Sequence, residues 1–205
     1  MPYPLEDIKV IDLTRVLAGP YCTMMLGDMG AEILKIEPPG TGDDSRSYGP
    51  PFIKGESSYF LSLNRNKKSI VIDLKSGDGR EILYKLVEKA DVLVENFRPG
   101  VMKKLKIDYP SLIKYNPRLI YCSITGFGQN GPYSQRPGYD IVGFSMSGMM
   151  SITGEQGRPP VKMGIPVADI GSGMFAAYAI LAALISRGKS GEGQYIDVSL
   201  LDGQV

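Results

Sequence analysis

Residues 8–37, IKVIDLTRVLAGPYCTMMLGDMGAEILKIE, decide the fold of this chain. The first six of them are mostly apolar and predict a buried strand at 8–13. A helix is predicted at 20–29, because proline opens that segment and glycine follows it. A second strand pattern at 31–37 ends at Pro38-Pro39-Gly40. The stretch therefore predicts a strand–helix–strand unit, which is the building block of a parallel sheet.

The same alternation continues along the rest of the chain. Further strands are predicted at 69–74, 91–97, 119–124 and 194–200, and further helices at 79–89, 101–115, 140–148 and 173–187. Residues 38–58 and 126–138 are predicted to be long loops, and 151–168 a turn-rich hairpin region. Strands that alternate with helices predict an α/β fold with a doubly wound, mostly parallel, Rossmann-like sheet. Ligands of such a sheet bind at the carboxyl ends of its strands.

The composition restricts the chemistry that these residues can perform. The 205 residues are 43% hydrophobic and 22% charged, which is typical of a globular domain with its own core. A formal net charge of +1 gives no support for nucleic acid or a membrane surface as a partner. The sequence contains no histidine, which excludes Ser-His-Asp arrangements and histidine metal sites from these residues. We expect no metal.

The cysteines and the apolar segments indicate a cytoplasmic protein. Cys22 and Cys122 lie in apolar surroundings without C-x-x-C spacing, which predicts buried free thiols in a reducing compartment. The first residues lack the basic and apolar regions of a secretory signal. The longest apolar stretch, 174–185, has about 12 residues, so it predicts a buried helix and no membrane span.

Asp169 is placed where a functional acid would be expected. It lies in GIPVADIGSG, residues 164–173, ahead of the long apolar helix, and the flanking glycines allow a ligand to approach. One interpretation is a helix N-cap, in which the carboxylate accepts backbone N–H groups two or three residues later. The other is a nucleophile, because helix N–H groups stabilise anions and developing oxyanions. The residues alone leave both interpretations open.

Other motifs are weaker. Gly188-Lys189-Ser190 resembles the end of a P-loop, but it follows a helix and Ala183 replaces the first glycine. GSGMFA at 171–176 fits a dinucleotide fingerprint, but no clear strand precedes it. The basic run NRNKK at 64–68 is typical of a solvated turn or of a phosphate contact. ENFRPG at 95–100 offers a ring for an adenine and a guanidinium for a phosphate at the end of a strand.

Several segments together resemble CoA-transferase family III, which includes formyl-CoA transferases, carnitine CoA-transferases and 2-methylacyl-CoA racemases. The matching segments are RVLAGP at 15–20, GAEILKIEPP at 30–39, NRNKKS at 64–69, DVLVENFRPG at 91–100, NPRLI at 116–120, GYD at 138–140, AD at 168–169, GEGQ at 191–194 and DVSLLD at 197–202. They run in order along the whole chain, and jointly they are specific.

The resemblance implies that CoA is transferred between an acyl-CoA and a free carboxylic acid through an acyl-aspartyl anhydride on Asp169. A carboxylate suits this role because it needs no base to deprotonate it at neutral pH. The CoA-binding residues that the resemblance implies are Val16, Leu17, Ala18, Ile72, Asp73, Leu74, Lys75, Asn96, Phe97, Arg98, Lys104, Arg136 and Tyr139. CoA or acyl-CoA is then a substrate, and no permanently bound cofactor is implied. The other partner is a small carboxylic acid, and family analogy suggests a dicarboxylate such as succinate.

The chain departs from the family pattern in two residues and in length. Pro38 stands where some members carry an arginine for the adenosine phosphate, and Tyr139 stands where the racemases carry a histidine. Racemisation is therefore a disfavoured alternative. Family members are about twice as long, continue into a small domain that returns to the first, and form interlocked homodimers. Residues 1–205 are thus expected to be the N-terminal part of the large CoA-binding domain, ending in the connection toward the small domain. A CoA-binding fragment without turnover is the other alternative.

Overall fold

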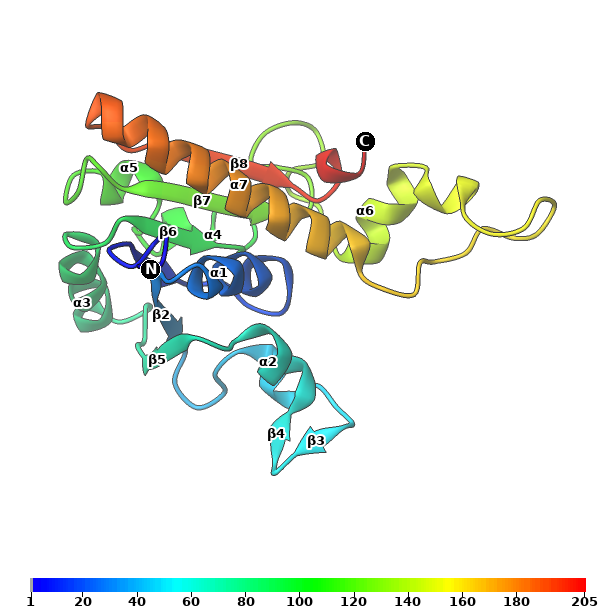
Figure 1. Ribbon diagram of the computed structural model, residues 1–205, viewed down its shortest axis with the longest axis horizontal. Helices are drawn as coiled ribbons and strands as arrows, with labels where there is room; N and C mark the ends of the chain where they lie inside the picture. Colours follow the sequence, from blue (N-terminus) through cyan, green and yellow to red (C-terminus); the bar gives the residue numbers. More distant parts are fainter. Residues whose placement is uncertain (1) are drawn as a thin grey trace.

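A six-stranded sheet forms the centre of the computed structural model, which describes residues 2–205 (Figure 1). Its strands are β1 (Lys9–Asp12), β2 (Glu32–Glu37), β5 (Lys67–Val71), β6 (Val92–Glu95), β7 (Ile120–Thr125) and β8 (Tyr195–Ser199). They lie in the order β5-β2-β1-β6-β7-β8, and every neighbouring pair is parallel. The predicted doubly wound, Rossmann-like sheet is confirmed.

The order of the strands reverses between β1 and β6. From β1 the chain builds outward through β2 to β5 at one edge, and then returns to β6 on the other side of β1. From β6 it builds outward in the opposite direction through β7 to β8. The loops that leave β1 and β6 therefore diverge, and a crevice opens between them at the carboxyl ends of the strands.

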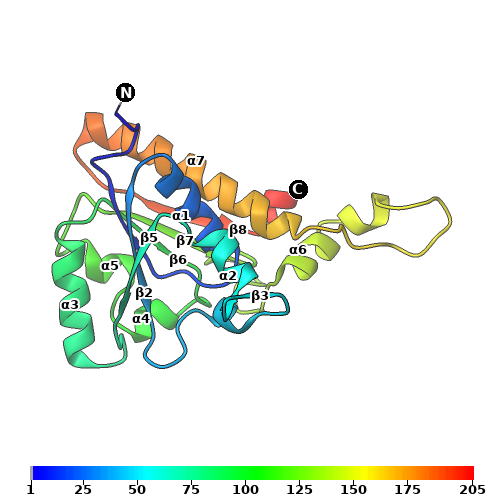
Figure 2. The ribbon, with the colours of Figure 1, turned by 60° about the horizontal axis from the view of Figure 1, so that its bottom comes forward.

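Helices cover both faces of the sheet (Figures 1 and 2). On one face, α1 (Ala18–Asp28) and α7 (Val167–Ser190) share a hydrophobic core with alternate residues of the strands. Both cysteines lie fully buried and free in that core, as predicted. On the other face, α3 (Gly77–Val87), α4 (Val101–Lys104) and α5 (Tyr109–Leu112) pack over a second core.

Some predicted boundaries are wrong. The helix predicted at 101–115 is divided into α4 and α5, because Lys106 turns the chain with a left-handed φ of 61°. Strand β5 ends at Val71, three residues before the end of the predicted strand. Residues 151–168 are all described and do not form the predicted hairpin. This segment begins within η2 (Met149–Ile152), which comes after α6 (Asp140–Met146), and it extends away from the sheet (Figures 1 and 2).

The predicted loop at 38–58 contains ordered structure. It holds η1 (Asp44–Ser47) and the antiparallel strands β3 (Phe52–Ile53) and β4 (Glu56–Ser57), and it leads into α2 (Ser58–Leu63). Together these elements project beside the edge of the sheet that carries β5 (Figure 1). A short 3-10 turn, η3 (Asp202–Gln204), closes the described chain.

Helix α7 has 24 residues and begins at Val167, earlier than the predicted start at 173. By length and composition alone, this helix could cross a membrane, so the expectation of a short apolar helix is wrong. One such helix is weak evidence for a membrane span, because core helices of soluble proteins have the same composition. Here its inner face packs against α1 and the sheet, while Phe175, Tyr178 and Ile185 are exposed on its outer face.

An ion pair is buried between the carboxyl end of β1 and the first residue of β5. The Lys67 amine lies 3.0 Å from the Asp12 carboxylate and donates to the Pro20 carbonyl at 2.9 Å. Burial alone would raise the pKa of Asp12, but the charges of Lys67 and Lys35 lower it to about 2. The basic run at 64–68 is therefore no simple solvated turn, because its fourth residue is an internal counter-ion.

Breaking the Asp12–Lys67 pair should destabilise the fold far more than breaking an exposed pair on the same sheet. Asp12→Asn leaves the buried Lys67 charge without compensation, so we expect the free energy of unfolding to fall by about 3–5 kcal/mol. Glu32→Gln breaks the exposed Glu32–Lys68 pair, 2.8 Å long, and should cost less than about 1 kcal/mol. Urea unfolding followed by circular dichroism measures both values. Equal losses in the two variants would contradict this account.

Candidate functional site

A cavity of about 290 Å³ lies at the reversal of strand order. One wall is formed by residues 15–18, which follow β1, and another by residues 96–99, which follow β6. The end of β7, the segment 134–139, Asp44, Leu200 and Asp169 complete the lining. This is the place where a doubly wound sheet binds its ligands.

Most of the residues predicted from the sequence lie around this one cavity. Nine of them line it: Val16, Leu17, Ala18, Asn96, Phe97, Arg98, Arg136, Tyr139 and Asp169. The other five, Ile72, Asp73, Leu74, Lys75 and Lys104, do not line it. Ile72 is buried in the second core, and Lys104 is exposed on α4. CoA contacts at these five residues stay predictions.

Asp169 lies in the first turn of α7 and is not its N-cap. Pro166 occupies the N-cap position and makes no side-chain capping bond. The carboxylate of Asp140 takes the capping role from α6, accepting the backbone N–H groups of Ala168 at 2.8 Å and Asp169 at 3.3 Å. The N-cap interpretation of Asp169 is therefore wrong, and its side chain is left to line the cavity.

The surroundings of Asp169 disfavour its negative charge. Its side chain is half-buried, and among residues 2–205 no lysine or arginine forms an ion pair with it. Burial, with the nearby Asp140 carboxylate, raises the pKa of Asp169 to about 7. Because this pKa lies above that of an unfolded aspartate, Asp169 lowers the stability of the fold as the pH rises from about 4 to 7. Its ionised form is a poorly solvated carboxylate, which favours nucleophilic attack.

Residues 14–16 form a strained turn, and Arg15 and Val16 of this turn line the cavity. Val16 has a left-handed φ of 67°, an unfavourable conformation for a β-branched residue. The Asn96 side chain accepts the Arg15 N–H and donates to the Arg15 carbonyl, both at 2.8 Å. The turn leads into α1, whose first turn has no side-chain cap. Its backbone N–H groups are therefore available to an anion.

At two places around the cavity, glycines let neighbouring segments approach each other closely. A Cβ on Gly126 would lie 2.4 Å from the Cα of Gly138, so the loop after β7 can touch the segment before α6 only without side chains. A Cβ on Gly173 would lie 2.6 Å from the Ala18 carbonyl oxygen, so α7 approaches α1 closely at this residue. The GSG motif at 171–173 thus serves helix packing in place of dinucleotide binding.

The sequence alone did not identify several residues of the site. Arg15 lies over the Phe97 ring at 5.2 Å and, with Arg136, places positive charge on the lining of the cavity. Thr125 also lines it, and within the described chain its buried hydroxyl has no hydrogen-bond partner. The pKa of Tyr59 is raised by burial and by the charge of Asp169, but this residue does not line the cavity. Residues 2–205 contain no cluster of histidine, cysteine and acidic side chains that could hold a metal ion.

Comparisons with known proteins agree on one family. The sequence model of CoA-transferase family III matches residues 5–205. Succinyl-CoA:glutarate CoA-transferase of Mus musculus is 51% identical over 202 residues, which are 98% of this chain and 46% of that protein. Succinate–glutarate CoA-transferase of Agrobacterium fabrum is 52% identical over 207 residues, covering 98% of this chain and 52% of its own length.

A solved structure has the same fold over the whole chain. The crystal structure of a CAIB/BAIF family protein from Brucella suis gives a TM-score of 0.96 at 47% identity. The match covers 100% of this chain and 55% of that one. The chain thus spans about half the length of the curated relatives and of the solved structure that it matches.

The raised pKa of Asp169 can be measured by its titration. In protein labelled with ¹³C-aspartate, we expect one carboxyl signal to titrate near pH 7 and to disappear in Asp169→Asn. Asp140→Asn keeps an oxygen that can accept the capping N–H groups but removes the neighbouring charge, so the midpoint should move to lower pH. Asp44→Asn, which changes another carboxylate of the same cavity, is the control and should leave the midpoint unchanged. A midpoint near 4, or one that Asp140→Asn does not move, would contradict the electrostatic account.

Proposed function

The chain belongs to CoA-transferase family III, and we propose that it carries the CoA site and the nucleophile of an enzyme that transfers CoA between an acyl-CoA and a free carboxylic acid. One observation carries the proposal. Asp169 shares a single cavity with eight of the residues predicted to bind CoA, at the reversal of strand order. The Asp169 carboxylate is half-buried, has no cationic partner and lies beside a site for a thioester. These properties suit nucleophilic catalysis.

The first step forms a mixed anhydride. An oxygen of ionised Asp169 attacks the thioester carbonyl, the carbon–sulfur bond breaks, and CoA leaves as a thiolate. The ionised form, which prevails above the pKa of about 7, has no proton to be removed, and this fits a chain without histidine. The uncapped first turn of α1 lies on the same cavity and offers backbone N–H donors to the developing oxyanion.

The second acid then exchanges for the first. The CoA thiolate attacks the aspartyl carbonyl and releases the first acid, which leaves an aspartyl-CoA thioester. The acceptor carboxylate attacks this thioester, forms a new anhydride and releases the thiolate again. Attack of the thiolate on the acceptor's carbonyl gives the new acyl-CoA and restores the Asp169 carboxylate, so no atom is gained or lost.

Small dicarboxylic acids are the substrates that we propose. The two relatives named above are succinyl-CoA:glutarate and succinate–glutarate CoA-transferases. The guanidinium groups of Arg15 and Arg136 on the lining of the cavity suit the second carboxylate of such an acid. Transfer is preferred to racemisation because Tyr139 stands where a base such as histidine would be needed.

A second candidate function is CoA binding without turnover, because the chain spans about half the length of its relatives. The interlocked homodimer, the cytoplasmic location and the place of these residues within a larger CoA-binding domain stay predictions. Calorimetry separates the two candidates when it is combined with a chemical trap. Affinity for CoA together with acyl transfer to Asp169 supports the transferase, whereas affinity alone supports the second candidate.

Hydroxylamine should trap the proposed anhydride. We expect the full-length protein, incubated with succinyl-CoA and hydroxylamine, to acquire a hydroxamate on Asp169, because hydroxylamine attacks the activated aspartyl carbonyl. Peptide mass spectrometry locates the modification. Asp169→Asn should lose the hydroxamate and lower the rate of transfer by at least about 10³-fold. Asp202→Asn, an exposed carboxylate on η3, is the matched control and should retain both.

Either of two results would contradict the proposed role of Asp169. One is a folded protein that binds CoA but gives no hydroxamate. The other is a hydroxamate on a different carboxylate, which would persist in Asp169→Asn.

A further inference from the structure

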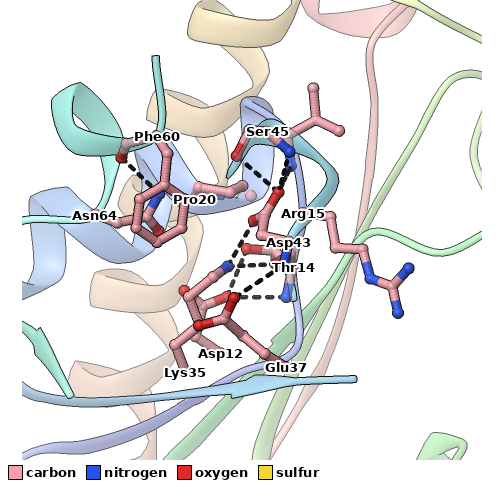
Figure 3. A network of polar contacts seen from close by, with 12 residues as sticks. Asp12, Thr14, Arg15, Pro20, Lys35, Glu37, Asp43, Ser45, Phe60 and Asn64 are labelled. Carbon is pink, nitrogen blue, oxygen red and sulfur yellow. Dashed lines mark hydrogen bonds and ion pairs between the residues drawn. The ribbon is translucent and has the colours of Figure 1, made fainter. Parts of the chain in front are cut away.

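Lys35 is a fully buried lysine at the carboxyl end of β2, only 1% exposed. Its amine donates to the Thr14 carbonyl at 2.7 Å and lies 2.8 Å from an oxygen of the Asp43 carboxylate. Figure 3 shows Lys35, Thr14 and Asp43 joined in one network of polar contacts. Burying an ammonium is costly unless a partner neutralises it, so the pair with Asp43 fixes where Lys35 can lie.

Asp43 is the partner that links Lys35 to the cavity wall. One of its oxygens faces Lys35, while the other accepts the backbone N–H groups of Val16 at 3.2 Å and Ser45 at 2.9 Å. Burial acts to raise the pKa of Asp43, but the Lys35 charge and the hydrogen bonds from Ser45 hold it below its usual range. Asp43 is therefore a permanently charged acceptor for the Val16 N–H.

The strand end anchors Asp43 in turn. Glu37, the last residue of β2, accepts the Asp43 N–H at 2.8 Å and forms two bonds of 2.7 Å with the Arg46 guanidinium. Ser69 on β5 donates to the same carboxylate. The loop that carries Asp43 is thus fixed to two strands, and its carboxylate cannot follow the Val16 turn if that turn moves.

The backbone of residues 14–16 is held almost entirely by side chains. The Thr14 N–H donates to Asp12, the Thr14 carbonyl accepts from Lys35, and the Val16 N–H donates to Asp43. The Asn96 side chain binds both backbone polar groups of Arg15, the N–H and the carbonyl. These bonds stabilise a left-handed conformation that valine adopts unfavourably, and strained backbone of this kind is concentrated at functional sites.

We propose that Lys35 and Asp43 are positioning residues for the acyl-CoA site. Their buried ion pair lies behind the cavity lining and holds the turn at 14–16 so that Val16 faces the substrate. The inference rests on the proposed function, because it requires the cavity to take acyl-CoA. Neither residue lines the cavity, so each acts through the backbone of the turn.

Asp43→Asn tests the inference in the full-length protein. Asparagine keeps the size and an acceptor for the Val16 N–H, but it removes the charge that holds the Lys35 amine. We expect the KM for succinyl-CoA and the Kd for CoA to rise about tenfold to hundredfold, because a small displacement of a binding wall has effects of that size. The turnover number at saturating succinyl-CoA should change much less, which is the signature of lost binding.

Asp91→Asn is the matched control. Asp91 forms another ion pair, 2.7 Å from the buried Arg187, at the opposite end of β6, with its own side chain half-buried. The same substitution there should lower the melting temperature in the same way and leave the KM for succinyl-CoA unchanged. Both variants are assayed at a temperature at which circular dichroism shows them folded.

A double variant distinguishes an effect on the position of the 14–16 turn from an effect on the stability of the fold. Lys35→Met with Asp43→Asn removes both charges, so no uncompensated ammonium remains and much of the melting temperature should return. The KM should stay raised, because the Thr14 carbonyl has lost its donor. A normal KM in a folded Asp43→Asn or double variant, or an equal rise in Asp91→Asn, would overturn the inference alone. Wild-type protein that binds no CoA would overturn the proposed function and this inference with it.

Discussion

From β1 the strands extend toward one edge of the sheet and from β6 toward the other, so the loops that leave these two neighbours cannot cover each other. This constraint creates the crevice, and the segments around it form its walls. The turn after β1, the loop after β6 and the first turn of α7 all meet there. Helix α7 can place Asp169 at this point because Gly173 lets it approach the start of α1 closely.

The pKa values of three aspartates in and beneath the walls of the crevice are shifted in opposite directions. Asp12 and Asp43 lie beneath one wall, where buried lysines hold their pKa values low and fix them as charged acceptors. Asp169 has no such cation and faces another carboxylate, so its pKa rises to about 7. The partners of each aspartate thus decide its role: Asp12 and Asp43 support the structure, and Asp169 is the reactive group. Within the basic run at 64–68, only Lys67 pairs with a buried carboxylate, while Arg65 and Lys68 pair with acids at the surface.

Apolar periodicity predicted the strands of the sheet. The family resemblance named nine of the residues that line the cavity, and six of these follow the carboxyl ends of β1 and β6. Prediction from the sequence failed where a tertiary contact decides the result. Nothing local shows that Asp140 caps α7, or that Gly173 packs against Ala18, because each contact joins segments far apart in the chain. Thr125 was missed for the same reason, since it carries no local motif.

In the proposed reaction, Asp169 forms a covalent bond with the acyl group through its own oxygen. Transfer of oxygen from the acceptor acid to Asp169 reports on this bond. If the full-length protein turns over succinyl-CoA with ¹⁸O-labelled glutarate, each cycle leaves one acceptor oxygen on the nucleophile. The account predicts a heavier peptide that contains Asp169, with the label located on that side chain. Turnover that leaves this peptide without ¹⁸O would contradict it.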